Sequence, residues 1–208
     1  MDGALARLDP EQTIEHLFYG GNATASLGYI GIADVQEICG DMSKEFALEI
    51  LHFLKGKTTE WFKRSNIYFS PYGSPMEMGC YKLATALKKA FPELGFNREY
   101  LTNSFHLHVF EDVNILEKFD SESDFYMLSS GGNVNNVELP NMSNNIEGLV
   151  SVIMAAKDKV NYLIVNQPVD QCFKCGYDGE FTATQDGFTC PVCGNKDEET
   201  VSVRRRIS

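Results

Sequence analysis

Four cysteines near the end of the printed sequence form two Cys-x-x-Cys pairs, Cys172 with Cys175 and Cys190 with Cys193. Four thiolates at this spacing are the ligand set of one tetrahedral Zn²⁺ ion. Each pair must turn sharply to aim both sulfurs at the same ion. A glycine follows each pair and supplies the backbone freedom that such a turn needs.

The residues between the two cysteine pairs have the pattern of a β-hairpin. Glu180–Thr184 and Phe188–Thr189 are typical of strands, and Gln185–Gly187 between them contains an Asp-Gly turn. Together with the cysteines, this pattern predicts a zinc ribbon with a structural metal. Two disulfides or a redox-active pair are the alternatives, and the lack of secretory features disfavours them, because cytosolic thiols stay reduced.

A second candidate site is the start of a helix. The sequence Ser74-Pro75-Met76-Glu77 matches a capping box with proline at the first helical position, and it follows the predicted strand 66–70 and a Tyr-Gly turn. A helix that starts after a strand and a turn presents free N–H groups and the positive end of its dipole, which suit a phosphate. A well-capped helix without a ligand explains the same residues.

Two pairs of residues give weaker signals. His106 and His108 fall on one face of a predicted strand and could bind a metal, but a polar strand face is the simpler explanation. Gly131 and Gly132 could let the backbone approach a ligand closely, but a plain turn or bulge is the simpler explanation there as well.

Single thiols and the basic end of the chain add little. Cys39 and Cys80 are predicted to be small buried hydrophobic residues. Arg204–Arg206 could grip phosphate or RNA, or form a solvated turn. Because no Ser-His-Asp or Cys-His-Asn spacing is present, we predict no catalytic residue in this chain.

Composition limits the class of protein. A length of 208 residues allows one substantial domain with a small appendage, and 43% hydrophobic residues indicate a real core. The net charge of −11 argues against binding to nucleic acid or to anionic membranes. No apolar run approaches the roughly 20 residues of a membrane span. The first residues lack a signal-peptide core, so we expect a cytoplasmic protein.

Predicted helices and strands alternate up to about residue 165. The helices are expected at 9–18, 34–38, 43–55, 74–91 and 146–159. The strands are expected at 27–32, 66–70, 100–110, 133–139 and 162–165, with a short one at 200–203. This alternation implies an α/β fold with a largely parallel sheet in residues 1–166, followed by a ribbon region in residues 167–208.

The chain resembles the C-terminal part of the anaerobic (class III) ribonucleoside-triphosphate reductases, which are glycyl-radical enzymes. The resemblance extends over most of the chain and depends on the order and spacing of several short segments. These segments are Ser26–Gly31, Gly73–Glu77, Tyr100–His106, Ser130–Gly132, Val137–Leu139 and Cys172–Cys193, the last followed by Val203–Arg206.

The resemblance implies the C-terminal part of a ten-stranded α/β barrel with a terminal zinc ribbon. It implies an oxidoreductase that converts ribonucleoside triphosphates to deoxyribonucleotides for DNA replication, with ATP binding and a homodimer in the complete enzyme. A radical-SAM activating enzyme with a 4Fe–4S cluster generates a glycyl radical, which passes to a cysteine, and formate or a dithiol supplies electrons. In related barrels a helix start holds substrate phosphate, which here implies Gly73, Ser74, Pro75, Met76, Glu77 and Met78.

The chain departs from the family pattern at both ends. It stops at Ser208, where the segment with the radical glycine should start, and the N-terminal half of the barrel with its catalytic cysteines is not in this sequence. We therefore expect a fragment that is inactive alone and associates with the missing half.

The alternative function is a zinc-ribbon binding module that contacts nucleic acid or a protein through its basic tail. Such a module should carry lysines and arginines beside the ribbon. Instead, the segment 178–199 holds six acidic residues and one lysine. Charge therefore favours the reductase reading and predicts no nucleic-acid partner.

Overall fold

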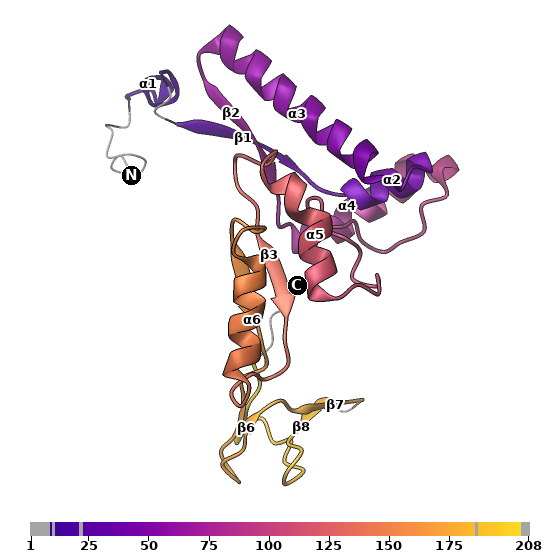
Figure 1. The fold of residues 1–208 in the computed structure, drawn as a ribbon, viewed down its shortest axis with the longest axis vertical. Helices are drawn as coiled ribbons and strands as arrows, with labels where there is room; N and C mark the ends of the chain where they lie inside the picture. The colour runs from indigo at the N-terminus through magenta and orange to yellow at the C-terminus, as the bar shows by residue number, and fades with distance from the viewer. Residues whose placement is uncertain (1–8, 10, 21–22, 186, 205–208) are drawn as a thin grey trace. The chain divides into compact units, whose positions relative to one another are not determined.

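The computed structural model describes residues 9, 11–20, 23–185 and 187–204, apart from the side chain of Glu77. The chain is a mixed α/β structure that divides into two compact units (Figure 1). Unit 1 comprises Met1–Glu111 and Ser121–Asn133, and unit 2 comprises Asp112–Asp120 and Val134–Ser208. Within the described ranges, no helix has both the length and the apolar character needed to cross a bilayer.

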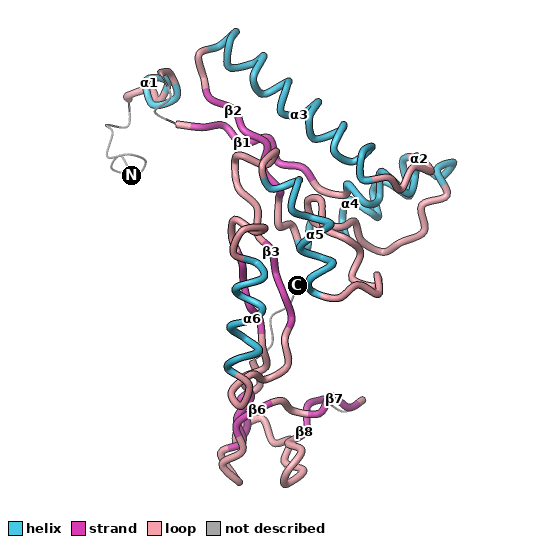
Figure 2. The backbone as a smooth tube through the Cα atoms, in the orientation of Figure 1, coloured by secondary structure: helices cyan, strands magenta, loops and turns pink. Residues whose placement is uncertain are grey.

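Unit 1 is built around a parallel pair of strands. Its elements are α1 (Glu15–Phe18), β1 (Thr24–Tyr29), α2 (Ile32–Cys39), α3 (Lys44–Ser65), β2 (Tyr68–Gly73), α4 (Glu77–Ala90) and the 3-10 turn η1 (Pro92–Leu94), and α5 (Ile115–Tyr126) contributes to both units. β1 and β2 run side by side (Figure 2), with Tyr29 opposite Gly73. The predicted parallel pairing is confirmed here, and the carboxyl ends of both strands lie at one edge.

The longest helix, α3, starts where the sequence predicts and continues further. Ser43 is the N-cap, and its hydroxyl accepts the Phe46 N–H at 3.3 Å. The prediction ended the helix near Lys55, but the structure extends it to Ser65. The reason is tertiary, because the last turns carry aromatic rings that stack on β2, with Phe62 and Tyr68 at 4.3 Å between ring centroids.

The first predicted helix is shorter than expected. α1 begins at Glu15 with Ile14 as its N-cap, not near Asp9. The Asp9 N–H donates to the Gln12 side chain at 3.2 Å, which closes a local turn instead of a helix. Pro10, the expected first helical residue, lies outside the described residues.

The strand expected at 100–110 is absent from the described structure of that segment, and this prediction was wrong. The segment is a loop whose backbone bonds to the residues after β1, through Gly31 N–H to Thr102 O at 2.8 Å and Ile32 N–H to Ser104 O at 3.2 Å. Ser104 has a φ of 43°, which breaks an extended conformation. The alternating side chains do not separate into two faces, because Phe105 and His108 are both buried.

A buried aspartate fixes this loop. Asp34 on α2 is 1% exposed, and its Oδ2 accepts the Thr102 N–H at 2.7 Å and the Thr102 hydroxyl at 2.9 Å. Three residues after Thr102, Phe105 stacks on Phe125 of α5, with 5.3 Å between ring centroids. Helix α5 was not predicted, although a capping box precedes it: the Asn114 side-chain oxygen accepts the Glu117 N–H at 3.0 Å, and the Glu117 carboxylate accepts the Asn114 N–H at 3.0 Å.

Unit 2 contains a second parallel pair and the ribbon. Its elements are β3 (Asn135–Glu138), α6 (Ile146–Ala156), β4 (Leu163–Asn166), β5 (Asp170–Cys172), β6 (Asp178–Gly179), β7 (Thr182–Thr184), β8 (Gly187–Thr189) and β9 (Val201–Ser202). β3 and β4 are parallel, and α6 lies along them (Figure 1). Phe119 of α5, Val137 of β3 and Ala156 of α6 form the buried cluster between these layers.

The ribbon has the predicted hairpin. β7 and β8 pair antiparallel, with Thr184 opposite Gly187, and β5 is the central strand between β6 and β9. Asp170 at the start of β5 is fully buried, and its carboxylate accepts the Phe181 N–H at 2.8 Å and the Arg204 N–H at 3.1 Å. This one side chain therefore ties both ends of the ribbon to β5.

We expect Asp170→Ala to lower the free energy of unfolding of unit 2 by about 1–3 kcal/mol, because the buried Phe181 N–H and the partly buried Arg204 N–H lose their acceptor. Asp170→Asn keeps one carbonyl oxygen and should lose less. Urea denaturation followed by NMR of ribbon amides measures the difference. Asp178→Ala, an exposed aspartate on β6, is the matched control, and equal losses in both variants would contradict the role of Asp170.

Candidate functional site

The four predicted cysteines converge in space. The sulfurs of Cys172, Cys175, Cys190 and Cys193 all lie within 4.8 Å of one another. The Sγ–Sγ distance is 3.6 Å between Cys172 and Cys193 and 3.7 Å between Cys175 and Cys190. All four are free thiols, so the disulfide alternative does not describe this cluster.

Two left-handed glycines shape the cluster. Gly176 and Gly194 follow the two pairs with φ values of 76° and 69°, and each N–H donates to the carbonyl of the first cysteine of its pair at 2.9 Å. Each pair therefore closes a tight turn that aims two sulfurs the same way. This confirms the expectation that glycine after each pair provides the turn.

The spacing of the sulfurs suits a zinc ion. A tetrahedral site with Zn–S bonds of about 2.3 Å places its sulfurs about 3.8 Å apart. The two Sγ–Sγ distances of 3.6 and 3.7 Å are close to that value. Four protein ligands would leave no open coordination position, so a metal here would be structural.

The electrostatics of the thiols also favour a cation. Burial raises the pKa of the Cys172 thiol, but hydrogen bonds from the Asn195 amide and from two backbone N–H groups outweigh it and lower the pKa to about 6. The Tyr177 N–H lowers the pKa of Cys175, but burial and the neighbouring thiols raise it to about 12. The lowered pKa of Cys172 favours its thiolate at neutral pH, and the thiolate is the form that binds a metal cation.

The start of α4 differs from the predicted capping box. The N-cap is Met76, not Ser74, and no side-chain cap bond is made by the N-cap residue. Ser74 is buried, and its hydroxyl approaches the Tyr72 carbonyl at 3.5 Å while its N–H donates to Tyr29 O at 3.1 Å. The predicted capping role of the Glu77 side chain lies outside the described residues. The box fails because Ser74 stays in register with β1 and cannot reach the helix.

A residue from another segment takes over the capping role. The Asn103 side-chain oxygen accepts the Met76 N–H at 2.8 Å and the Cys80 thiol at 3.2 Å. Sequence reasoning missed Asn103, because a cap supplied from 27 residues away leaves no local pattern. Met76 and Met78 are exposed, so the first turn of α4 is open at its surface.

The residues beside Gly73 are polar and tightly packed. A side chain on Gly73 would place its Cβ 3.0 Å from the Ser104 Cβ and 3.3 Å from the Asn133 Cβ. Asn133 is 5% exposed, and within the described chain neither its amide nitrogen nor its amide oxygen has a hydrogen-bond partner. Gly131 and Gly132 pack against β2 here, and the Gly131 N–H donates to the Pro71 carbonyl at 2.8 Å. Because these two residues lack side chains, the backbone of their loop can lie close to β2.

The remaining candidates separate from one another. His106 pairs with Glu122 at 3.0 Å, whereas His108 lies 3.6 Å from Asp34, so the two histidines do not share a metal site. Cys80 is buried as expected, but Cys39 is exposed on α2, and its predicted burial was wrong. Of the three arginines, Arg204 is described, and its backbone N–H donates to Asp170 at 3.1 Å, while Arg205 and Arg206 lie outside the described residues.

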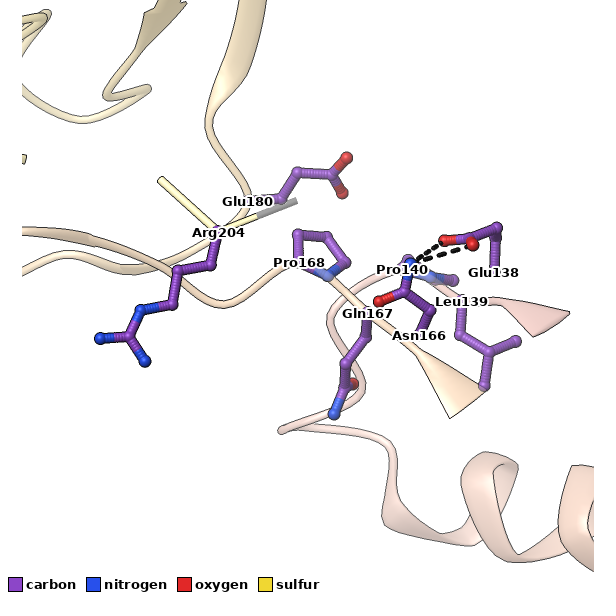
Figure 3. Close-up of a pocket in the computed structure, with 8 residues that line it drawn as sticks. All are labelled: Glu138, Leu139, Pro140, Asn166, Gln167, Pro168, Glu180 and Arg204. Carbon is purple, nitrogen blue, oxygen red and sulfur yellow. Dashed lines mark hydrogen bonds between the residues drawn. The ribbon is translucent and has the colours of Figure 1, made fainter. Parts of the chain in front are cut away.

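Unit 2 also has a cavity of about 360 Å³ at the carboxyl ends of β3 and β4 (Figure 3). Its polar lining includes Glu138, Asn166, Glu180 and Arg204. The Asn166 amide donates to both oxygens of Glu138 at 2.9 and 2.8 Å, so that carboxylate is already satisfied. The mixed charge of the lining does not select an anion, and we assign no ligand to this cavity.

Comparisons with known proteins identify relatives along the whole chain. A family model described as "Anaerobic ribonucleoside-triphosphate reductase" matches residues 1–208. The enzyme of that name from Enterobacteria phage T4 is 35% identical over 202 residues, which is 96% of this chain and 33% of the phage protein. The Escherichia coli K12 enzyme is 35% identical over 219 aligned positions, which cover 100% of this chain and 31% of that protein. This chain thus spans about a third of the length of these curated relatives.

Solved structures share the fold. An anaerobic ribonucleotide reductase matches with a TM-score of 0.66 at 19% identity, over 83% of this chain and 28% of that chain. The Thermotoga maritima enzyme with dATP bound in the specificity site matches with a TM-score of 0.64 at 19% identity, over 83% of this chain and 29% of that chain. At this identity the likeness concerns the arrangement of helices and strands.

We expect the purified protein to carry about one zinc per chain by elemental analysis. Cys190→Ser should abolish stoichiometric zinc and unfold the ribbon, because three ligands no longer close the tetrahedron, while α2–α4 keep their structure. Cys39→Ser, which removes an exposed thiol outside the cluster, is the matched control and should retain zinc. A purified protein that contains no metal and still has an ordered ribbon would contradict the zinc assignment.

Proposed function

Because this chain belongs to the anaerobic ribonucleoside-triphosphate reductase family, we propose that it supplies the C-terminal part of such an enzyme. In the complete enzyme it takes part in converting ribonucleoside triphosphates to deoxyribonucleotides. The observation that carries this proposal is the match of the reductase family model to residues 1–208, together with 35% identity over 96% of the chain to a reductase about three times its length.

We propose that residues 1–166 are part of a ten-stranded α/β barrel and that residues 167–208 form the zinc-ribbon region. The two parallel strand pairs, β1 with β2 and β3 with β4, support the first part, because parallel strands with intervening helices are the units of an α/β barrel. The four clustered thiols support the second part.

The zinc ion is proposed to be structural, bound by Cys172, Cys175, Cys190 and Cys193. When bound, it neutralises the thiolates and fixes β5 against β9, since Cys172 pairs with Val201 in that ladder. Asp170 then holds the backbone at Arg204. The ribbon thereby fixes the position of the backbone at Arg204, where the arginine-rich segment begins.

We propose that the segment Gly73–Met78 lies against the phosphates of the substrate and donates to them through the backbone N–H groups of Glu77 and Met78 in the first turn of α4. The N–H groups of Gly73, Ser74 and Met76 already have acceptors, and Pro75 has no N–H. Free N–H groups and the helix dipole favour an anion at this end. The open surface around Met76 and Met78 supports access. The position at the carboxyl ends of β1 and β2 supports it as well, because ligands of α/β folds bind at that edge.

The radical chemistry is proposed to involve residues outside this chain. In the complete enzyme a radical-SAM activating protein would generate the glycyl radical, and a cysteine of the preceding part of the polypeptide would carry the thiyl. Cys80 is buried and hydrogen-bonded to Asn103, and Cys39 lies on the outer surface of α2, so neither is assigned this role. The assembled enzyme is proposed to be a cytoplasmic homodimer.

Gly73→Ala tests the phosphate site in the reductase assembled from this chain and the rest of the polypeptide. The added Cβ would come 3.0 Å from the Ser104 Cβ and displace the segment. We expect the KM for ribonucleoside triphosphate to rise about tenfold, a loss of about 1.4 kcal/mol. Gly56→Ala, on α3 with open space around it, is the matched control.

The glycyl-radical yield, measured by electron paramagnetic resonance, separates binding from activation. The yield should be unchanged in Gly73→Ala. An unchanged KM with a reduced radical yield would assign the start of α4 to the activation machinery instead of substrate binding.

Association with the rest of the reductase is a further expectation. On α6, four large apolar side chains are exposed, and they fall at helical spacing along one stripe: Ile146, Val150, Ile153 and Met154. An apolar stripe of this kind normally packs against another element. In sedimentation velocity runs the isolated chain should self-associate, or bind the remaining part of the polypeptide when that part is added. A stable monomer that does not bind the remaining part of the polypeptide would contradict the interpretation of this chain as part of a barrel.

A further inference from the structure

The start of α4 is organised by the Asn103 side chain, which comes from the loop after η1. Its oxygen accepts the Met76 N–H at 2.8 Å. Because an N–H donor requires an acceptor, the amide oxygen must face Met76, and the amide NH₂ is the other arm of the same planar group. The two N–H donors of Asn103 therefore lie next to the first turn of the helix.

These amide donors are not used inside the described part of the chain. The Asn103 oxygen has two partners, Met76 and Cys80, whereas its Nδ2 donates to no atom of the described residues. Asn103 is half-buried, so its amide is at the edge of the surface that the first turn of α4 leaves open. A polar group in this position is well placed to donate to a bound molecule.

The loop that carries Asn103 is rigid for independent reasons. On one side of it, both the N–H and the hydroxyl of Thr102 donate to the buried Asp34 carboxylate. On the other side, the Ser104 carbonyl accepts the Ile32 N–H at 3.2 Å. Asn103 is thus held between the starts of two helices, α2 and α4, and its amide is oriented before any ligand binds.

A second observation also indicates a ligand at this edge. Asn133 lies against Gly73, the first residue of the proposed phosphate segment, and is 5% exposed. Its amide nitrogen and oxygen have no partner in the described chain. Buried polar groups are normally hydrogen-bonded, so an unpaired amide beside this segment is expected where a ligand completes the network.

We propose that Asn103 is a ligand-positioning residue that caps α4 with its oxygen and donates its amide N–H groups to the phosphate bound at the first turn of that helix. This inference rests on the proposed phosphate site. The neutral amide suits a polyphosphate, since it adds donors beside the backbone N–H groups without a charge that would pair with one oxygen alone.

The substitution Asn103→Asp separates the two roles of the side chain. A carboxylate caps a helix start at least as well as an amide, so the melting temperature should not fall. The same carboxylate has no N–H donors and repels phosphate, so binding should weaken. Asn97→Asp, an exposed position in the same region, adds the same charge away from the helix start and is the matched control.

The experiment titrates the ¹⁵N-labelled chain with inorganic tripolyphosphate and follows the amide signals of residues 77–79. We expect saturable shifts in the unchanged chain, an at least tenfold higher Kd for Asn103→Asp with an unchanged melting temperature, and an unchanged Kd for Asn97→Asp. Asn103→Ala, which loses both roles, should bind more weakly and melt earlier.

Two results would overturn the proposal, and they differ in whether the proposed phosphate site at α4 is also contradicted. If Asn103→Asp folds normally and binds tripolyphosphate as tightly as the unchanged chain does, Asn103 does not contact the phosphate, and the proposed site at α4 survives without it. If the unchanged chain itself shows no saturable shift at residues 77–79, the phosphate site fails and the role of Asn103 fails with it.

Discussion

Each unit depends on a buried aspartate that accepts hydrogen bonds from a segment distant in the sequence. In unit 1, Asp34 binds the N–H and hydroxyl of Thr102, and in unit 2, Asp170 binds the N–H groups of Phe181 and Arg204. A carboxylate removed from water is costly unless such donors reach it. The segments that supply these donors are therefore fixed in place. One of them is the loop that leads to the start of α4, and the other is the ribbon that carries the four cysteines.

The surroundings of Asp34 show that hydrogen bonds, not an ion pair with histidine, stabilise its charge. His108 lies 3.6 Å from Asp34, and neither ring nitrogen has a hydrogen-bond partner among the described residues. Burial lowers the pKa of His108, although Asp34 acts in the opposite direction. His108 is thus neutral at pH 7, and the Thr102 donors carry the stabilisation. The sequence pattern of two alternating histidines gave no sign of this difference from His106.

The sequence predicted well those features that depend on neighbours in the chain. The zinc-ligand pattern of Cys172 to Cys193, the glycines after each pair and the hairpin between them are all local, and the structure brings them together. It predicted poorly what depends on distant contacts. The alternation at 100–110 is typical of a strand, but hydrogen bonds to Gly31 and Ile32 and the left-handed Ser104 make it a loop. The rings on β2 extend α3 beyond the residue where its own pattern weakens.

The capping box shows most clearly why a local pattern was not sufficient. Ser74-Pro75-Met76-Glu77 has the residues of a self-capped helix, but the Ser74 N–H donates to the Tyr29 carbonyl at the end of β1, and the helix begins at Glu77 with Met76 as its N-cap. The unfilled cap is then supplied by Asn103, which Asp34 holds in place through Thr102. The geometry of the helix start is therefore set by a chain of contacts from α2 through a loop to α4. Residues without any catalytic chemistry of their own, such as Asp34, therefore determine how the Asn103 side chain meets the start of α4.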